Sequence, residues 1–303
     1  MKTFFILSLL AISLSAFTQQ DPLYSQYINN PFVINPAYAG FTNNLSTSLS
    51  YRQQWAGFEG SPKTINANGH LALTDNRMGV GLMISTDQIG SNTVTEVFGS
   101  YAYRIALDNN KNLSFGLQAG AANYAVDNSK VNPADPGDPL FEGSISEMKP
   151  SFGAGIIFST DLLFVGFSVP RMLKPSLTDD NGVTTSLYSQ HYYAMGSYLI
   201  FLSQRVRFKP SVLVKMVSGA PASIDLNASV ILYENYQAGV ITRDFNTYGL
   251  FLQGIFKNSF RLGYVFEVPT ANSVGTNFTT HEITLGFRMN LFTFHDNSSA
   301  ISF

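Results

Sequence analysis

The sequence predicts an all-β protein: a transmembrane antiparallel β-barrel of about 14 strands that follows a short amino-terminal segment. Three observations predict this fold. Polar and apolar residues alternate along most of the chain, as they do in strands with two different faces. The connections between the alternating stretches are short and long in turn. Charged residues make up 13 % of the 303 residues, whereas about 25 % is typical of soluble proteins.

The composition also excludes several classes of protein. A chain that is 45 % hydrophobic and weakly charged does not stay disordered in water. The net charge is −2, and no basic run could displace counterions from a phosphate backbone, so we expect no nucleic-acid partner. Because the chain contains no cysteine, it has neither disulfide bonds nor thiolate metal sites.

Residues 1–18 are expected to be a secretory signal peptide. A lysine provides the positive start, an apolar stretch follows over 4–14, and Ala16 and Thr18 occupy the small-residue positions before a cleavage site at Gln19. The alternative is an amphipathic helix of a cytoplasmic protein. No later run approaches the roughly 18 apolar residues of a membrane-spanning helix. We therefore expect the mature chain to be exported without a helical anchor.

Residues 19–43 form the predicted pre-barrel segment, which differs in composition from the chain that follows. The Asp-Pro step at Asp21 and the Asn-Pro steps at Asn30 and Asn35 favour turns or extended backbone over helix. The aromatic and amide side chains of this segment suit two environments. It could fill a polar barrel lumen as a plug, or it could dock a partner, and the sequence leaves both interpretations open.

Residues 44–292 carry the alternating pattern and are the predicted barrel, and residues 293–303 are a polar tail. Most alternating segments are about ten residues long, which suits a tilted strand that crosses a bilayer. We count 14 of them, and an even number lets both ends of a closed barrel lie on the same side of the membrane. They begin near Leu45, Thr64, Gly79, Thr93, Leu113, Ser151, Leu163, Tyr192, Val206, Ser223, Tyr236, Gly249, Phe260 and His281.

The connections favour a membrane barrel over a soluble β-sandwich. The even-numbered connections are all short, whereas the odd-numbered ones include the long stretches 53–63, 128–148, 174–190 and 270–280. Short turns at one end and long loops at the other are typical of outer-membrane barrels, and a sandwich has no reason to sort its loops in this way. One odd-numbered connection, near 244–247, is short and departs from the pattern. A soluble sheet with one solvated face is the alternative.

The two faces of the predicted strands are expected to lie in different environments, lipid and lumen. Lipid accepts a backbone only when all its N–H and C=O groups pair within the protein, so a spanning sheet must close. A charge on the lipid face costs about 2–4 kcal/mol near the bilayer midplane, so we expect the charged face to line the lumen. Glycines on this inward face suit the close approach of a plug or of neighbouring side chains. The charges expected to point inward are Glu96, Arg104, Arg207, Lys209, Lys215, Asp225, Arg261, Glu267 and Arg288.

The sequence contains little that points to reaction chemistry. Its four histidines are scattered and lack the spacing of metal ligands. Ser189 lies close to His191, but no oxyanion hole is predicted beside this pair. The acidic residues Asp135, Asp138 and Glu142 lack the repeat of a calcium loop, and solvated loop charge is the better interpretation. We therefore expect no enzymatic activity, no cofactor and no bound metal.

A long motif near the amino terminus resembles a known family. Residues 21–40 match the pattern Asp-Pro-x-x-Ser-Gln-Tyr-x-x-Asn-Pro-x-x-x-Asn-Pro-Ala-Tyr-Ala-Gly. Shorter matches follow at 55–64, 79–82, 87–90, 101–105, 113–117, 209–211 and 281–283. On these residues the chain resembles the PorP/SprF family of Bacteroidota outer-membrane proteins, which is associated with the type IX secretion system and gliding motility. The resemblance covers nearly the whole mature chain, although 264–267 in the next-to-last strand is less typical.

The resemblance implies an outer-membrane protein that aids the secretion or surface attachment of a large protein, often an adhesin with a C-terminal sorting domain. It implies contacts with outer-membrane lipid and with periplasmic or lipoprotein components of the type IX machinery. A passive channel for small solutes is the alternative function. The candidate partner-binding residues carried over from the family motif are Asp21, Pro22, Ser25, Gln26, Tyr27, Asn30, Pro31, Asn35, Pro36, Tyr38, Gly40, Trp55, Gly57, Phe58, Pro62 and Lys63. Of these, Trp55 is interpreted as an anchor of the first long loop rather than as an exposed contact.

Overall fold

The computed structural model is built almost entirely of strands. It describes residues 24–108, 110–128, 144–178, 184–218, 220–270 and 277–295, so the predicted signal peptide lies outside the described residues. Three short 3-10 turns come first: η1 (Gln26–Ile28), η2 (Pro31–Val33) and η3 (Pro36–Tyr38). The strands are β1 (Leu45–Gln53), β2 (Lys63–Leu73), β3 (Met78–Ile89), β4 (Asn92–Asp108), β5 (Lys111–Asp127), β6 (Ser144–Ser159), β7 (Leu163–Val169), β8 (Ser176–Thr178), β9 (Thr184–Ser186), β10 (His191–Tyr198), β11 (Ile200–Phe201), β12 (Val206–Val217), β13 (Ser223–Leu232), β14 (Tyr236–Arg243), β15 (Thr247–Phe256), β16 (Phe260–Pro269) and β17 (Thr280–Met289).

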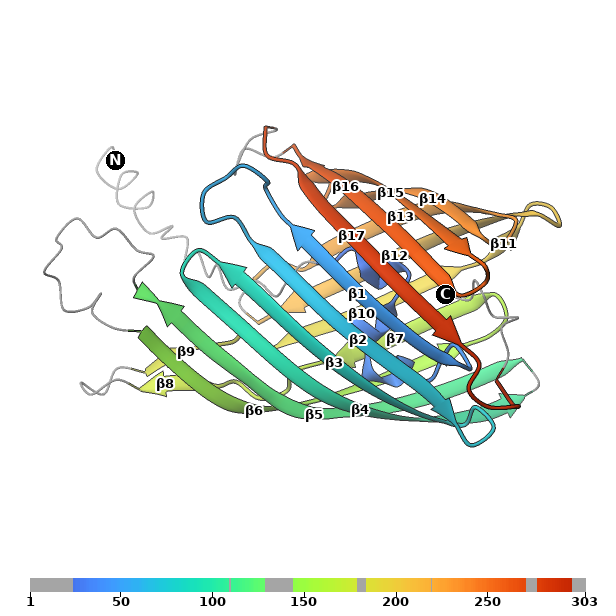
Figure 1. Ribbon diagram of the computed structural model, residues 1–303, viewed down its shortest axis with the longest axis horizontal. Coiled ribbons are helices and arrows are strands. Elements are labelled where there is room, and N and C mark those ends of the chain that lie inside the picture. Colours follow the sequence, from blue (N-terminus) through green and yellow to red (C-terminus); the bar gives the residue numbers. More distant parts are fainter. Residues whose placement is uncertain are drawn as a thin grey trace, which may run out of the picture.

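The main sheet closes on itself, which confirms the predicted fold class of a 14-stranded antiparallel barrel (Figure 1). β1 pairs with β17 in a continuous register that runs from Leu45 opposite Met289 to Gln53 opposite His281. β10 pairs with both β7 and β12, and the two-residue β11 extends the pairing along β12. β8 and β9 form a separate hairpin. Closure pairs the backbone groups of the first and last strands, as a sheet in lipid requires.

The two ends of the barrel differ in the length of their connections, as predicted. At one end, here called the short-turn end, few residues link the strands, and Asp75 and Asn76 adopt positive φ angles of 52° and 63°. Asp and Asn tolerate this conformation better than most residues, and it matches the twist of a tight hairpin. The other end, the long-loop end, carries the extended connections, but 90–91 as well as 244–246 is short there. β1 begins and β17 ends at the short-turn end.

The predicted alternation places apolar side chains outside the barrel and polar side chains inside it. Large residues such as Leu117 and Leu250 are exposed on the outer wall, while Asn66 and Ser114 are buried in the lumen. Of the charges predicted to point inward, Glu96, Lys209, Asp225, Glu267 and Arg288 are buried. Arg207 instead pairs with Glu234 of a short turn near the barrel end. Among the described residues, no helix has the length and apolar character needed to span a membrane.

Candidate functional site

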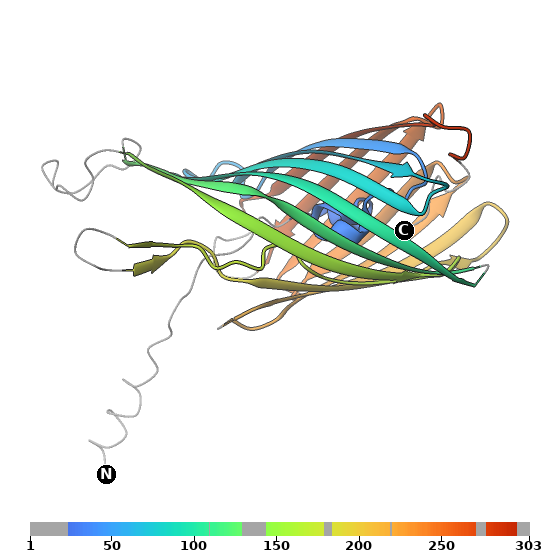
Figure 2. The same ribbon diagram turned by 90° about the horizontal axis from the view of Figure 1, so that it is seen from below.

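A part of the chain itself occupies the barrel lumen. Tyr24–Asn44, here called the lumen segment, passes inside the ring of strands through three 3-10 turns, which are dark blue in Figure 2. Ala37 and Tyr38 in this segment are almost completely buried. Pro31 and Pro36 start η2 and η3, where the fixed φ of proline fits and its missing N–H is not needed. The described part of the pre-barrel segment, from Tyr24 onward, therefore occupies the first of its two predicted environments, the lumen.

At the long-loop end of the lumen, Ser25 is held by buried charged side chains from three neighbouring strands. Its backbone N–H donates to Glu282 at 2.9 Å, and its hydroxyl donates to Glu267. Arg52 bridges the two carboxylates, at 2.7 Å from Glu267 and 3.0 Å from Glu282. Arg243 lies 3.8 Å from Glu267 as well. We refer to Ser25, Arg52, Glu267 and Glu282 as the entry cluster.

Farther along the lumen, side chains of the wall donate hydrogen bonds to backbone carbonyls of the lumen segment. Short 3-10 turns leave several carbonyls without an internal partner, and a buried carbonyl needs one. The pairs are Lys209 to Ile28 at 3.3 Å, Arg261 to Asn29 at 3.1 Å, Ser168 to Ile34 at 2.7 Å, Ser114 to Ala37 at 2.8 Å and Arg104 to Gly40 at 3.1 Å. The polar inner face thus matches the backbone of the lumen segment along its length.

Asn35 joins the lumen segment to strands β6 and β7 of the wall. Its side-chain oxygen accepts from the N–H of Ala37 at 3.0 Å and so caps η3. Its side-chain amide donates to the carbonyls of Ile156 and Phe167 on β6 and β7, both at 3.3 Å. One side chain therefore fixes both the local turn and its place against the sheet.

In the half of the lumen near the short turns, the backbone of the lumen segment touches the wall directly. A Cβ on Gly116 would lie 2.1 Å from the nitrogen of Ala37, and a Cβ on Gly79 would lie 2.0 Å from the carbonyl oxygen of Ala39. The inward glycines that leave this space are Gly79, Gly81, Gly116 and Gly155. These positions confirm the prediction that inward glycines permit a close approach.

Arg171, just after β7, and Tyr188, just before β10, are buried near the long-loop end of the lumen. Arg171 pairs with Glu96 at 2.8 Å, and its guanidinium lies 4.2 Å from the ring centre of Tyr188. Two cavities beside the lumen segment have volumes of about 20 Å³ each, which is room for roughly one water molecule.

The first long loop, residues 54–62, is fastened to the rim of the barrel. The backbone N–H of Ala56 donates to the carbonyl of Thr279 at 2.7 Å, and the ring of Phe58 packs edge-on against Phe278 with centroids 5.4 Å apart. Trp55 is partly buried and has a positive φ of 54°. The loop is therefore packed against the rim of the barrel at the long-loop end, and the side chain of Phe58 is exposed there.

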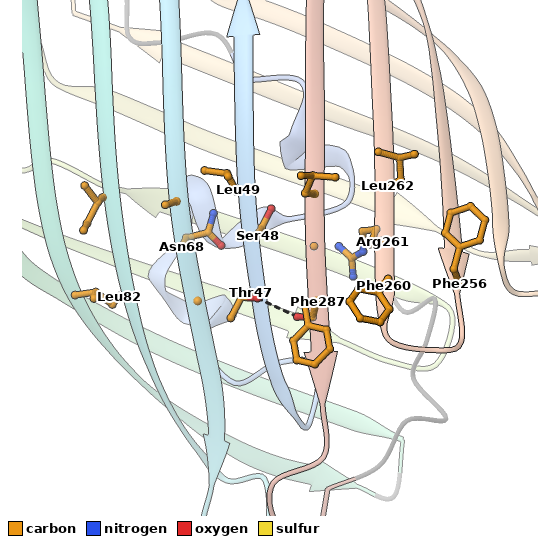
Figure 3. Close-up of a pocket in the computed structure, with 15 residues that line it drawn as sticks. Thr47, Ser48, Leu49, Asn68, Leu82, Phe256, Phe260, Arg261, Leu262 and Phe287 are labelled. Atoms are coloured by element: carbon orange, nitrogen blue, oxygen red, sulfur yellow. Dashed lines mark hydrogen bonds between the residues drawn. The ribbon is translucent and has the colours of Figure 1, made fainter.

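A groove of about 730 Å³ lies on the outer wall across the seam between β1 and β17 (Figure 3). Leu82 on β3 borders it on one side and Phe256 on β15 on the other, and Gly69 and Thr47 are among the residues that line it between them (Figure 3). The hydroxyl of Thr47 donates to the carbonyl of Phe287, so it is not free for a ligand. The groove thus suits hydrocarbon and belongs to the apolar outer surface.

The structure places the candidate partner-binding residues in two groups. The lumen group consists of Ser25, Tyr27, Asn30, Pro31, Asn35, Pro36, Tyr38 and Gly40, all buried inside the barrel. The rim group consists of Trp55, Gly57, Phe58, Pro62 and Lys63, in or beside the first long loop. Asp21, Pro22 and the side chain of Gln26 lie outside the described structure. Partner binding by these residues stays a prediction, and in this conformation the lumen group faces the barrel wall.

The sequence interpretation missed Arg52 and Glu282 of the entry cluster. They lie 230 residues apart, so no local spacing connects them. A signal was present in the alternation, which places both on the inward face near the ends of adjoining strands. A buried carboxylate needs a cation or donors close by, so the two inward glutamates of the last strands required an arginine among their neighbours.

Solved structures confirm the kind of fold. The CymD monoaromatic hydrocarbon channel is 11 % identical, covers 90 % of this chain and 94 % of its own, and superposes with a TM-score of 0.53. A FadL homologue from Pseudomonas aeruginosa is 10 % identical, covers 85 % of this chain and 93 % of its own, and has a TM-score of 0.50. At these identities the likeness shows the fold alone, that of an outer-membrane barrel.

Sequence families define the chain further. A comparison with curated proteins gives no match. A family profile described as "Type IX secretion system membrane protein PorP/SprF" matches residues 16–287, which is most of the sequence. Together with the barrel fold, this match assigns the protein to the outer membrane. The chain belongs to the PorP/SprF family of type IX secretion system membrane proteins.

Proposed function

We propose that this protein is a closed, non-enzymatic attachment partner of the type IX secretion system that holds a secreted surface protein at its long-loop end. The observation that carries this proposal is the lumen segment, which fills the barrel and bonds to its wall from Ser25 to Gly40. While that segment is in place, a client polypeptide has no free passage through the lumen. Attachment therefore fits the geometry better than conduction.

The client and the partners of the proposal come from the family resemblance. The client is a large adhesin with a C-terminal sorting domain, and a role in gliding motility belongs to the same proposal. Periplasmic or lipoprotein components of the machinery would meet the short-turn end, because outer-membrane barrels turn this end to the periplasm. The apolar outer wall meets outer-membrane lipid.

Two observations support a non-enzymatic role. The Nδ1 of His191 lies 2.6 Å from the carbonyl oxygen of Ser189 and 3.1 Å from the hydroxyl of Tyr188, so this buried ring is engaged in local structure. Among the described residues, no three side chains of His, Asp or Glu gather closely enough to hold a metal ion. The working surface we propose is therefore one of shape and hydrogen bonds.

Conductance in planar bilayers tests the closed lumen. The purified full-length chain is expected to give no large steady conductance, because the lumen segment fills its pore. A large steady conductance of the isolated protein would contradict the proposal and favour the alternative, a passive channel for small solutes.

Deletion of the gene tests the attachment role. Surface display of the cognate adhesin should be lost, while its synthesis continues. Normal display in the deletion strain would count against the proposal. A pull-down in gentle detergent, followed by mass spectrometry, identifies the client whose display is to be measured.

A further inference from the structure

We propose that the lumen segment enters the barrel from the cell-surface end, so that the processed amino terminus is presented outside the cell while the end of β17 faces the periplasm. This inference does not depend on the proposed attachment role. It rests on where the two ends of the lumen segment are fixed and on which end of the barrel carries the long loops.

The upstream end of the lumen segment is fixed close to the long-loop end. Ser25 bonds to Glu282, the third residue of β17, and to Glu267, the third residue from the end of β16. Arg52, which also contacts Ser25, is the last residue but one of β1. At about 3.3 Å per strand residue, these contacts lie within roughly 7 Å of the strand ends.

The downstream end of the lumen segment is fixed at the short-turn end. The backbone N–H of Gly40 donates to His70 at 3.2 Å, and Gly40 packs against Gly79, the second residue of β3. The carbonyl of Asn44 accepts from the N–H of Ala72, next to the last residue of β2. β1 begins directly afterwards at the same end.

The length of the segment allows one crossing of the lumen. Ser25 and Gly40 are 15 residues apart, and a 3-10 conformation advances about 2 Å per residue, which gives roughly 30 Å. The apolar band of an outer-membrane barrel is about 25 Å tall. The chain between Ser25 and Gly40 therefore crosses the lumen once, and Tyr24, where the described chain begins, lies on the side of the long loops.

The connection lengths then assign the sides of the membrane. Outer-membrane barrels turn their short connections to the periplasm and their long loops outward. An even number of strands returns the chain to the end at which it started, and the Nε2 of His295, six residues after β17, lies 2.9 Å from the carbonyl oxygen of Ala72 at the short-turn end. The two ends of the described chain thus lie on opposite sides. A partner that binds the processed amino terminus would be a surface or secreted protein, not a periplasmic component.

Single cysteines test this topology, because the chain contains none of its own. Gln20→Cys reports on the amino terminus, Glu59→Cys on the first long loop, and Gln204→Cys, a matched substitution, on an exposed short connection. The full-length variants are expressed in the outer membrane, and intact cells are treated with a membrane-impermeant maleimide. We expect Gln20→Cys and Glu59→Cys to be labelled in intact cells, and Gln204→Cys only after the outer membrane is permeabilised.

A labelling of Gln20→Cys that appears only after permeabilisation, together with that of Gln204→Cys, would overturn the proposal. So would a Gln20→Cys that stays unlabelled under both conditions, since the amino terminus would then remain inside the lumen. Mass spectrometry of each purified variant establishes that position 20 is present after signal cleavage. Asp21→Cys is a second variant with the same expected outcome, should the first one alter processing.

Discussion

The two halves of the lumen segment are held to the barrel by different physical means. Upstream, Ser25 is positioned by hydrogen bonds and by the paired charges of Arg52, Glu267 and Glu282. Downstream, the backbone lies directly against inward glycines such as Gly116. The position of Ser25 depends on which charged side chains surround it, whereas the position of the downstream backbone depends on the space that the glycines leave. The upstream half should therefore respond to the loss of a partner and the downstream half to the gain of a methyl group.

The largest effect is expected from Arg52→Met. It removes the guanidinium that pairs with both buried carboxylates, whereas Arg243 stays 3.8 Å from Glu267. Removing one partner of a buried ion pair destabilises a protein by about 3–5 kcal/mol, because the remaining charge stays desolvated. Unfolding by denaturant in detergent measures the loss, and the only tryptophan of the sequence provides the fluorescence signal.

Arg207→Met is the matched control for that prediction. Arg207 pairs with Glu234, whose side chain is half exposed in a short turn. Exposed ion pairs contribute about 0–1 kcal/mol, so this variant should unfold almost like the original protein. Equal losses in the two variants would show that the entry cluster carries no special share of the stability.

The next effect in size is expected from Gly116→Ala. The new Cβ would lie 2.1 Å from the nitrogen and 2.4 Å from the Cα of Ala37, both backbone atoms that cannot rotate away. Overpacking of this kind costs about 1–3 kcal/mol. Gly263→Ala on the same inward face is the control, because the atom nearest to its Cβ would be the Cβ of Thr284, at an ordinary contact distance of 3.5 Å. In the same unfolding assay, the difference between the free energies of unfolding of the two variants reports the contact of residue 116 with the lumen segment. Equal losses of stability in both variants would contradict the prediction.

An effect of similar size is expected from Ser25→Ala. The variant loses the hydroxyl that donates to Glu267 and accepts from Arg52, but it keeps the backbone N–H that donates to Glu282. A hydrogen bond to a charged group contributes about 1.5–3 kcal/mol. In the Arg52→Met background the same substitution should cost less, since part of the network is already gone. Purely additive losses in this double-mutant cycle would mean that Ser25 and Arg52 act independently.

The barrel could be predicted from the sequence because its signal is local. Alternation with a period of two identifies each strand from its own residues, and closure follows from the cost of unpaired backbone in lipid. The main error in a boundary is at β6, which starts at Ser144 rather than near Ser151. Pro150 and the charged pair Glu147 and Lys149 hide the pattern there, whereas register with β5 keeps the strand going.

The contacts of the two halves of the lumen segment were predictable to different degrees, because one set has a local signal in the sequence and the other does not. The inward glycines mark the close approach, and each can be recognised within its own strand. The entry cluster is assembled from β1, β16 and β17, with Arg52 and Glu267 separated by 215 residues. Only the ring of strands brings these residues together, so the direction of the lumen segment could be known only from the closed barrel.

The smallest effect on stability is expected from truncating an exposed phenylalanine at either end of the barrel. The two truncations test which end binds the client. Phe58 in the first long loop and Phe256 beside a short turn are exposed to nearly the same extent, 47 % and 48 %. Truncation of exposed side chains usually changes stability by no more than about 0.5 kcal/mol, so Phe58→Ala and Phe256→Ala should both fold. If the client is held at the long-loop end, Phe58→Ala should reduce the amount of client on intact cells, as measured by flow cytometry, and Phe256→Ala should not. Aromatic residues are enriched in the centres of protein interfaces, so a client display that is insensitive to Phe58, or equally sensitive to both, would place attachment elsewhere.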